Sequence, residues 1–168
     1  MRSWLLFALF FLMAVPASGS DTIAIAPSGN WVAPGAIPKP NPDYANESFQ
    51  ALLVDRQDKF GDAQTETYFE TALLIQDAEG LGLGNVVIEW SPEFADLTVH
   101  KVNILRGDET IDLLAEGQKF EILRREPNLE AAILDGMLTA TMQPEGLRVG
   151  DTINVAYTIS FHNPLLQG

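Results

Sequence analysis

Apolar and polar residues alternate along most of the chain after Phe49, which is the pattern of half-buried β-strands. The clearest segment is 152–161. There, the odd positions from Ile153 to Phe161 are apolar and would share one face of a strand, while the even positions from Thr152 to Ser160 would share the other. This segment therefore predicts a strand that buries one of its two faces.

The same alternation predicts further strands, which are separated by glycine, proline and aspartate. In one of them Leu97 and Val99 share a face, but Val102 and Ile104 fall on the opposite face, so we expect a β-bulge or a change of sheet near His100. The predicted segments are 68–76, 86–90, 97–104, 120–122 and 138–142.

Turn chemistry marks the breaks at 80–85, 106–108, 134–136 and 143–146, and Asp135-Gly136 between two apolar runs is a hairpin signal. Short strands with turns at this spacing indicate an all-β fold, an antiparallel β-sandwich. Two segments leave an alternative open: 128–134 could form a turn or two of helix, and 47–57 could form a short helix or a strand.

The region before the strands divides into two parts. Residues 4–15 are an unbroken apolar run after Arg2, and small residues follow it. A helix over this run would span about 18 Å, short of the ~30 Å hydrocarbon core of a bilayer. A signal peptide over 1–19, cleaved near Ala17 or Gly19, therefore fits better than a membrane anchor. A Pro/Gly-rich arm over 20–46 would then lead to a β-sandwich domain over 47–168, with Trp31 attaching the arm to that domain.

Composition excludes several classes of function. The 168 residues include 23 acidic and 10 basic side chains, and 46% are apolar, which is enough for one folded domain. A net charge of −13 argues against nucleic acid as a partner. There is no cysteine, so a thiolate nucleophile, a disulfide, a Cys-type zinc site and an N-terminal lipid anchor are all excluded. Export without cysteine suits a bacterial periplasm or the extracellular space.

The candidate sites are weak when each is compared with an ordinary structural explanation. The glycine-rich segment 79–84 precedes a predicted strand, whereas a nucleotide loop must precede a helix, so we expect a flexible connection between strands. His100 and His162 are the only histidines, and a lone histidine in a strand is more often a hydrogen-bonded structural residue than a general base.

The carboxylates give no clearer signal. Glu121 and Glu126 could be imagined as the acid and the nucleophile of a glycosidase, but the sequence cannot place them in one cleft. The run 55–58 with Asp62 matches a calcium loop poorly and fits a solvated charged turn. Arg124-Arg125-Glu126 favours ion pairing with acids such as Asp135, and Asn46-Glu47-Ser48 is a formal glycosylation sequon. We therefore expect no catalytic, cofactor-binding or metal-binding residue, and the sequence singles out no binding residue.

Several blocks of the chain resemble the family known as the domain of unknown function 3857. The most specific is Arg148-Val149-Gly150-Asp151, which we expect to form a turn into the last strand, with Gly150 at positive φ and Asp151 bonded to the turn backbone. The other blocks are 30–32, 52–57, 97–102, 124–126, 129–130, 133–140, 152–153, 157–159 and 163–164.

The resemblance implies a bacterial envelope protein whose β-sandwich domain precedes a transglutaminase-like domain with a Cys-His-Asp triad, sometimes followed by membrane segments. It transfers no catalytic residue, because the family domain carries no established ones. Family members normally continue with further strands after 163–164, so we expect these 168 residues to be an N-terminal fragment or a truncated product. Residues 151–161 would then border an unfinished sheet with exposed strand edges.

The sequence thus predicts a non-catalytic exported β-sandwich accessory or interaction domain with no cofactor. Its partners would be a downstream transglutaminase-like domain in the same polypeptide and an envelope peptide or glycan, but no nucleic acid, and no stable membrane span would remain after signal cleavage. The alternatives are a stand-alone peptide- or glycan-binding module and a carboxylate-based hydrolase. A mainly helical body, or an enclosed pocket in which His100 meets a hydroxyl and an acid, would contradict this interpretation.

Overall fold

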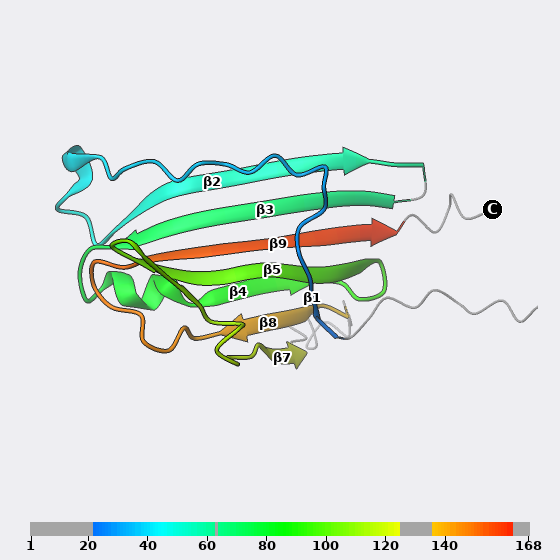
Figure 1. The fold of residues 1–168 in the computed structure, drawn as a ribbon. Helices are drawn as coiled ribbons and strands as arrows, with labels where there is room; N and C mark the ends of the chain where they lie inside the picture. The colour runs from blue at the N-terminus through cyan, green and yellow to red at the C-terminus, as the bar shows by residue number, and fades with distance from the viewer. Residues whose placement is uncertain (1–21, 63, 125–135, 163–168) are drawn as a thin grey trace, which may run out of the picture.

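The computed structural model of the protein describes residues 22–62, 64–124 and 136–162 and shows two β-sheets packed face to face (Figure 1). The predicted all-β, antiparallel β-sandwich is confirmed. The larger sheet has the strand order β1-β5-β9-β3-β2, with β6 paired to β5, and the smaller sheet has the order β4-β8-β7. Every strand pair is antiparallel except β1 with β5.

The larger sheet contains β1 (Ala24–Ile25), β2 (Phe49–Phe60), β3 (Gln64–Ile75), β5 (Ala95–Arg106), β6 (Glu109–Asp112) and β9 (Thr152–His162). The smaller sheet contains β4 (Val86–Trp90), β7 (Glu121–Arg124) and β8 (Leu138–Met142). Two 3₁₀ helices complete the described elements, η1 (Pro42–Tyr44) and η2 (Gly80–Gly84).

The hydrophobic core lies between the two sheets, and its largest fully buried side chain is Trp90 of β4. The predicted phase change in β5 is present. The pairing of β5 with β9 shifts register between Val99 and Lys101, so that His100 is the extra residue of a β-bulge. Because of this bulge, Leu97 and Val99 before it and Val102 and Ile104 after it are all buried in the same core.

Strand β9 is the centre of the larger sheet, which corrects the expectation that residues 151–161 border an unfinished sheet. It pairs with β5 along one edge and with β3 along the other. Its even positions are also buried, although the sequence predicted one buried face: Asn154 is 3% exposed, Ala156 is fully buried and Thr158 is 5% exposed. The reason is that side chains from β3 and β5 close over this second face.

Several smaller predictions can be compared with the structure. Residues 55–58 lie inside β2 rather than in a charged turn, so that prediction is wrong, and the open choice for 47–57 is resolved as a strand from Phe49 onward. The signal segment over 1–19, the alternative helix over 128–134 and Asp135 of the hairpin signal lie outside the described residues.

The glycine-rich connection between β3 and β4, which the sequence predicted to be flexible, is a 3₁₀ helix whose two ends, Gly80 and Gly84, are closely packed. Asp77 accepts hydrogen bonds from the backbone N–H groups of Glu79 and Gly80 at 2.8 and 3.0 Å. A Cβ atom on Gly80 would lie 2.1 Å from the backbone oxygen of Ser48, whereas one on Gly82 would meet nothing within 4 Å. Glycine at position 80 is therefore required by close packing, and nothing in the packing requires it at position 82.

We expect Gly80→Ala to lower the free energy of unfolding by about 1–3 kcal/mol, because the backbone of residue 48 must shift to admit the methyl group. Gly82→Ala is the matched control, and it should be neutral or stabilise by up to about 1 kcal/mol. Urea denaturation of both variants measures the difference. Equal effects at the two positions would contradict the packing explanation.

Candidate functional site

The segment before β2 is laid across the outer face of the larger sheet, the face directed away from the smaller sheet. In Figure 1 it follows β2 and then crosses in front of β3, β9 and β5 to reach β1. Within the predicted arm over 20–46, residues 26–41 make this crossing, and from here on the name arm refers to residues 26–41. Its Ala26 N–H donates to the carbonyl of Val99 at 3.2 Å, which extends the pairing of β1 with β5 by one bond.

Two glutamine side chains of β2 hold the arm by its backbone. The Gln57 amide accepts from Ala33 N–H at 2.8 Å and donates to Ala33 C=O at 2.7 Å. The Gln50 amide makes the same pair of bonds with Asn41, at 2.7 and 3.0 Å. Each amide therefore imitates the edge of a neighbouring β-strand.

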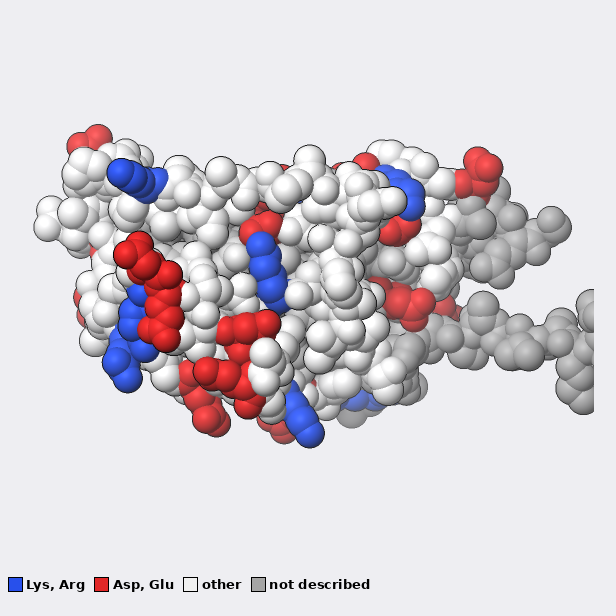
Figure 2. All heavy atoms as spheres, in the orientation of Figure 1, with Lys and Arg blue, Asp and Glu red and all other residues white. Residues whose placement is uncertain are grey.

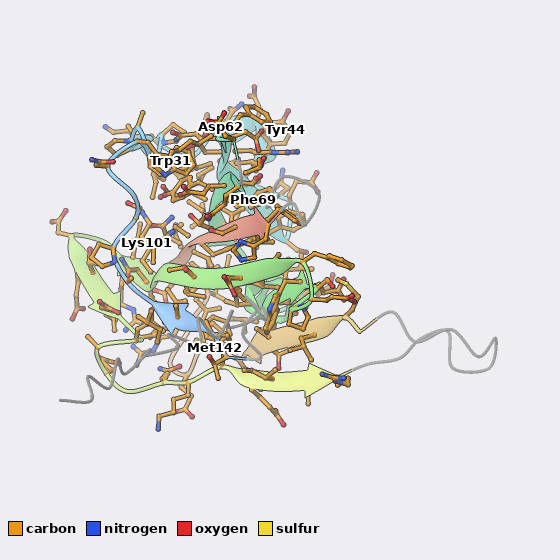
Figure 3. All side chains as sticks on the ribbon, turned by 90° about the vertical axis from the view of Figure 1, so that its right-hand side faces the viewer. Trp31, Tyr44, Asp62, Phe69, Lys101 and Met142 are labelled. Carbon is orange, nitrogen blue, oxygen red and sulfur yellow. The ribbon has the colours of Figure 1, made fainter. Side chains whose placement is uncertain are left out.

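Trp31 attaches the arm to the sheet as the sequence predicted. Its indole N–H donates to Glu66 Oε2 at 3.0 Å, and Lys59 Nζ lies 5.9 Å from the centre of its ring. Lys59 also donates to Glu66 at 2.8 Å, so these three side chains form one cluster, in which Lys59 is exposed and the other two are half-buried. In Figure 3, Trp31 and Lys101 lie on the arm's side of the sheet.

A cavity of about 490 Å³ lies between the arm and the sheet. The sheet contributes Tyr68, Glu70, His100 and Lys101, and the arm contributes residues 27–30, 32 and 34–35. On this face of the molecule, acidic and basic side chains are interspersed among the described residues, with no broad patch of basic ones (Figure 2). The cavity therefore has acidic, basic and neutral polar side chains on the wall formed by the sheet, and the arm covers it.

Glu70 is the buried charge of this cavity, with 2% of its surface exposed. Its carboxylate accepts from Lys101 Nζ at 2.5 Å, Tyr68 OH at 2.6 Å and Asn154 Nδ2 at 3.0 Å. Burial alone would raise the pKa of Glu70, but these donors outweigh it and hold that pKa below its usual value. Burial and the Glu70 carboxylate raise the pKa of Tyr68, so Tyr68 stays protonated.

His100, at the β-bulge, connects the arm to the centre of the sheet. Its Nδ1 lies 2.8 Å from the carbonyl oxygen of Ala26, and its Nε2 lies 2.7 Å from Thr158 Oγ1. Because a carbonyl can only accept, Nδ1 carries the proton, and in the neutral ring Nε2 accepts from the Thr158 hydroxyl. The ring also stacks on Tyr68, with centroids 5.8 Å apart.

His100 meets a hydroxyl beside a cavity that contains an acid, which comes close to the arrangement that a catalytic histidine would need. The acid, however, is bonded to Lys101 and not to His100, and the second ring nitrogen is held by a backbone carbonyl. Thr158 is 5% exposed in the middle of the sheet, where a substrate has little access to its oxygen. The contacts of His100 are those of a residue that fixes the arm.

The other candidates of the sequence analysis are dispersed. His162 contacts Asp96 at 2.7 Å at the end of β9. Glu121 is exposed on β7, and its suggested partner Glu126 lies outside the described residues, as do Arg125 and Asp135. Within 22–62, 64–124 and 136–162, no three histidine or acidic side chains are grouped so as to hold a metal ion.

The turn before β9 contains a buried ion pair that the sequence did not reveal. Arg106, the last residue of β5, donates Nε and Nη2 to the two oxygens of Asp151 at 2.9 and 2.7 Å. Asp151 is 2% exposed and also accepts from Arg148 N–H at 2.8 Å, while Gly150 has φ +90°. The turn geometry predicted for Gly150 and Asp151 is thus confirmed, and its further role is to join two central strands.

The fold and the arm define a two-sheet β-sandwich with an extended strap across one outer face. The chain belongs to the family described as a domain of unknown function, DUF3857, which it matches over residues 61–168. No curated protein matches the chain. It is similar in structure to a putative protease from Parabacteroides distasonis ATCC 8503, with a TM-score of 0.59 and 17% identity. That similarity covers 68% of this chain and 23% of the other, and it concerns the fold alone.

We expect Asp151→Ala to lower the free energy of unfolding by about 3 kcal/mol, the lower end of the range for a broken buried ion pair, because Arg106 is partly exposed. Glu79→Ala is the control, since the exposed Glu79 side chain makes no capping hydrogen bond at η2, and it should change stability by less than about 0.5 kcal/mol. Urea denaturation measures both. An Asp151→Ala variant as stable as the control would contradict this role.

Stability should also depend on pH through Asp151 and Glu70. The hydrogen bonds from Arg106 outweigh the effect of burial and hold the pKa of Asp151 below its usual value. The hydrogen-bond donors around Glu70 likewise hold the pKa of Glu70 below its usual value. A carboxyl whose pKa is lower in the folded state stabilises the protein fully above its unfolded pKa, about 4, and loses this contribution as pH falls through the folded pKa.

The free energy of unfolding should therefore stay level from pH 7 to about pH 5 and fall below about pH 4. Asp151→Asn removes one of the carboxyl groups whose pKa is lowered in the folded state, so the stability difference between the wild type and this variant should shrink as the pH drops toward 2. Urea midpoints at pH 7, 5, 4 and 3 measure this. A difference that stays constant over the series would contradict the ion pair's contribution.

Proposed function

We propose that this chain is a non-catalytic, exported accessory domain that precedes a transglutaminase-like domain in one polypeptide, where it packs against or presents that domain. The observation that carries the proposal is the structural similarity, which occupies 23% of a much longer chain. In that protein a β-sandwich of this shape is one part of a larger polypeptide. Membership of DUF3857 supports the same interpretation.

A non-catalytic role is supported by the way the cavity's polar groups satisfy one another. Glu70 is the one carboxylate among the described residues that line the cavity, and three donors already bind it. The nearest second carboxylate is that of Asp55, which is paired with Glu70 across β2 and β3. It accepts a hydrogen bond from Gln57 Nε2 at 2.7 Å, so it is engaged in the contact that holds the arm. A glycosidase needs an acid and a nucleophile that are free to reach the substrate, and the contacts of Glu70 and Asp55 give the carboxylate-based hydrolase little support.

An exported location is supported by the apolar run over 4–15 and the small residues that follow it. Among the described residues, no helix has both the length and the apolar character that a membrane crossing requires. The net charge of −13 supports a partner other than nucleic acid. A bacterial periplasm or the extracellular space remains the location we propose.

The second candidate is a stand-alone module that binds an envelope peptide or glycan, and the cavity of about 490 Å³ beneath the arm favours it. The cavity has a charged pair, a phenol and an imidazole on one wall and peptide backbone on the other. Such a wall suits a ligand with its own hydrogen-bonding groups.

The reading frame after Gly168 tests the accessory-domain proposal. We expect it to continue into a segment with a cysteine block and later histidine and aspartate residues, and N-terminal sequencing of the protein from its host should begin near residue 18 or 20. A stop codon directly after Gly168 would contradict the accessory role and leave the stand-alone module. A mature protein that retains Met1 would contradict the cleaved signal peptide.

A further inference from the structure

We propose that the outer face of the β5-β9-β3-β2 sheet is a binding site for an extended, proline-rich peptide, and that the arm occupies this site in cis. The proposal gives the peptide-binding alternative a location and a ligand class. It does not depend on a downstream domain, so the reading frame after Gly168 does not decide it.

The sheet recognises the arm by its backbone. Gln57 and Gln50 each bind both the N–H and the C=O of one arm residue, and His100 binds the carbonyl of a third. Contacts of this kind are nearly independent of the side chains of the bound segment. A different chain with the same backbone geometry can therefore make the same bonds.

The two glutamines bind arm residues that are eight positions apart. Ala33 and Asn41 are held by Gln57 and Gln50, so the arm runs antiparallel to β2. The bulge in β2 leaves the two glutamines opposite Leu74 and Tyr68, which are six residues apart on β3 and span about 20 Å. Eight residues of polyproline helix span about 25 Å, so the arm can reach from one glutamine to the other without being fully extended. The register shift between Ala51 and Leu53 reverses the side-chain alternation, so that positions 50 and 57 of opposite parity both reach the arm.

The composition of the arm agrees with this spacing. Pro34, Pro38 and Pro40 have no backbone N–H, and they fall between the two residues whose N–H groups are bound. Proline also keeps an unbound segment extended, which reduces the entropy lost on binding. The ligand class is therefore an extended proline-rich peptide with non-proline residues eight positions apart and an aromatic residue two positions before the first.

The arm is held to the sheet by few contacts. Nearly all of its residues are exposed, and only Trp31, Val32 and Ile37 are half-buried. Beneath it lies the cavity of about 490 Å³ rather than a packed core. Covalent linkage gives the arm an effective concentration of the order of 1 mM, so a free peptide competes well only when the attachment of the arm is weakened.

The probe is a fluorescein-labelled synthetic peptide with the sequence of residues 24–44, added to the full chain. Trp31→Ala weakens the arm and leaves the sheet unchanged, and Ala33→Pro does the same by removing the N–H that Gln57 accepts. Because Kd,app equals the intrinsic Kd divided by the open fraction, we expect either variant to bind the peptide at least about 10-fold more tightly than the wild type. Fluorescence anisotropy measures the affinity.

Two controls locate the bound peptide. When Gln50→Ala and Gln57→Ala are both introduced into the Trp31→Ala variant, peptide binding should weaken at least about 10-fold. Gln143 is an exposed glutamine elsewhere on the surface, and Gln143→Ala in the same variant should leave the affinity unchanged. A peptide that carries Ala33→Pro and Asn41→Pro should bind at least about 10-fold more weakly, because both donors are lost.

The proposal is overturned if the arm-weakened variants bind the peptide no more tightly than the wild type, or if loss of both glutamines leaves the affinity unchanged. Circular dichroism establishes that each variant is folded, and Ala33→Pro replaces Trp31→Ala if the latter unfolds. Hydrogen exchange of the Asn41 amide measures whether either substitution releases the arm. If both variants protect this amide as well as the wild type does, the proposal is also contradicted.

Discussion

Strand β9 makes backbone hydrogen bonds along both of its edges and is covered on both of its faces, and the rest of the molecule is arranged around it. Its odd positions enter the core against the smaller sheet. Its even positions lie beneath the polar side chains of β3 and β5, where Asn154 binds Glu70 and Thr158 binds His100. The Arg106–Asp151 ion pair fixes where the strand begins. A buried polar face of this kind is stable only because its groups have partners.

This two-sided burial supports the proposal that the outer face is a place of interaction rather than of chemistry. The carboxylate of Glu70 has three donors, and the imidazole of His100 has a partner on each nitrogen, so the groups that could react are engaged in holding the structure. On its outer side the face carries hydrogen-bonding side chains, Gln50, Gln57 and His100, that bind the backbone of the arm. The arm binds to these groups, and under our proposal an extended peptide of similar chemistry binds to them too.

The sequence predicted those features that local patterns determine. Six of the strands, the bulge at His100, the turn at Gly150 and the contact of Trp31 follow from alternation, turn chemistry or an isolated aromatic residue. The short strands β1 and β6 were not predicted, and the choice between helix and strand at β2 was left open. The sequence did not predict the central place of β9, because pairing between distant strands leaves no local signal. For the same reason Tyr68, Glu70, Lys101, Gln50 and Gln57 gave no indication of a shared site. In a regular strand, positions 50 and 57 would place the two glutamines on opposite faces of the sheet. Only the register shift in β2 brings them to the same face.

Native-state hydrogen exchange, measured by NMR at increasing low concentrations of denaturant, tests the central claim most directly. The account predicts that the amides of Asn154, Val155 and Ala156 exchange only through global unfolding. The amides of Ala33 and Asn41, which are protected by glutamine side chains, should exchange through a smaller opening of lower free energy that leaves β9 protected. Exchange of arm and β9 amides with the same free energy and the same denaturant dependence would contradict the account, since the arm would then be part of the cooperative core.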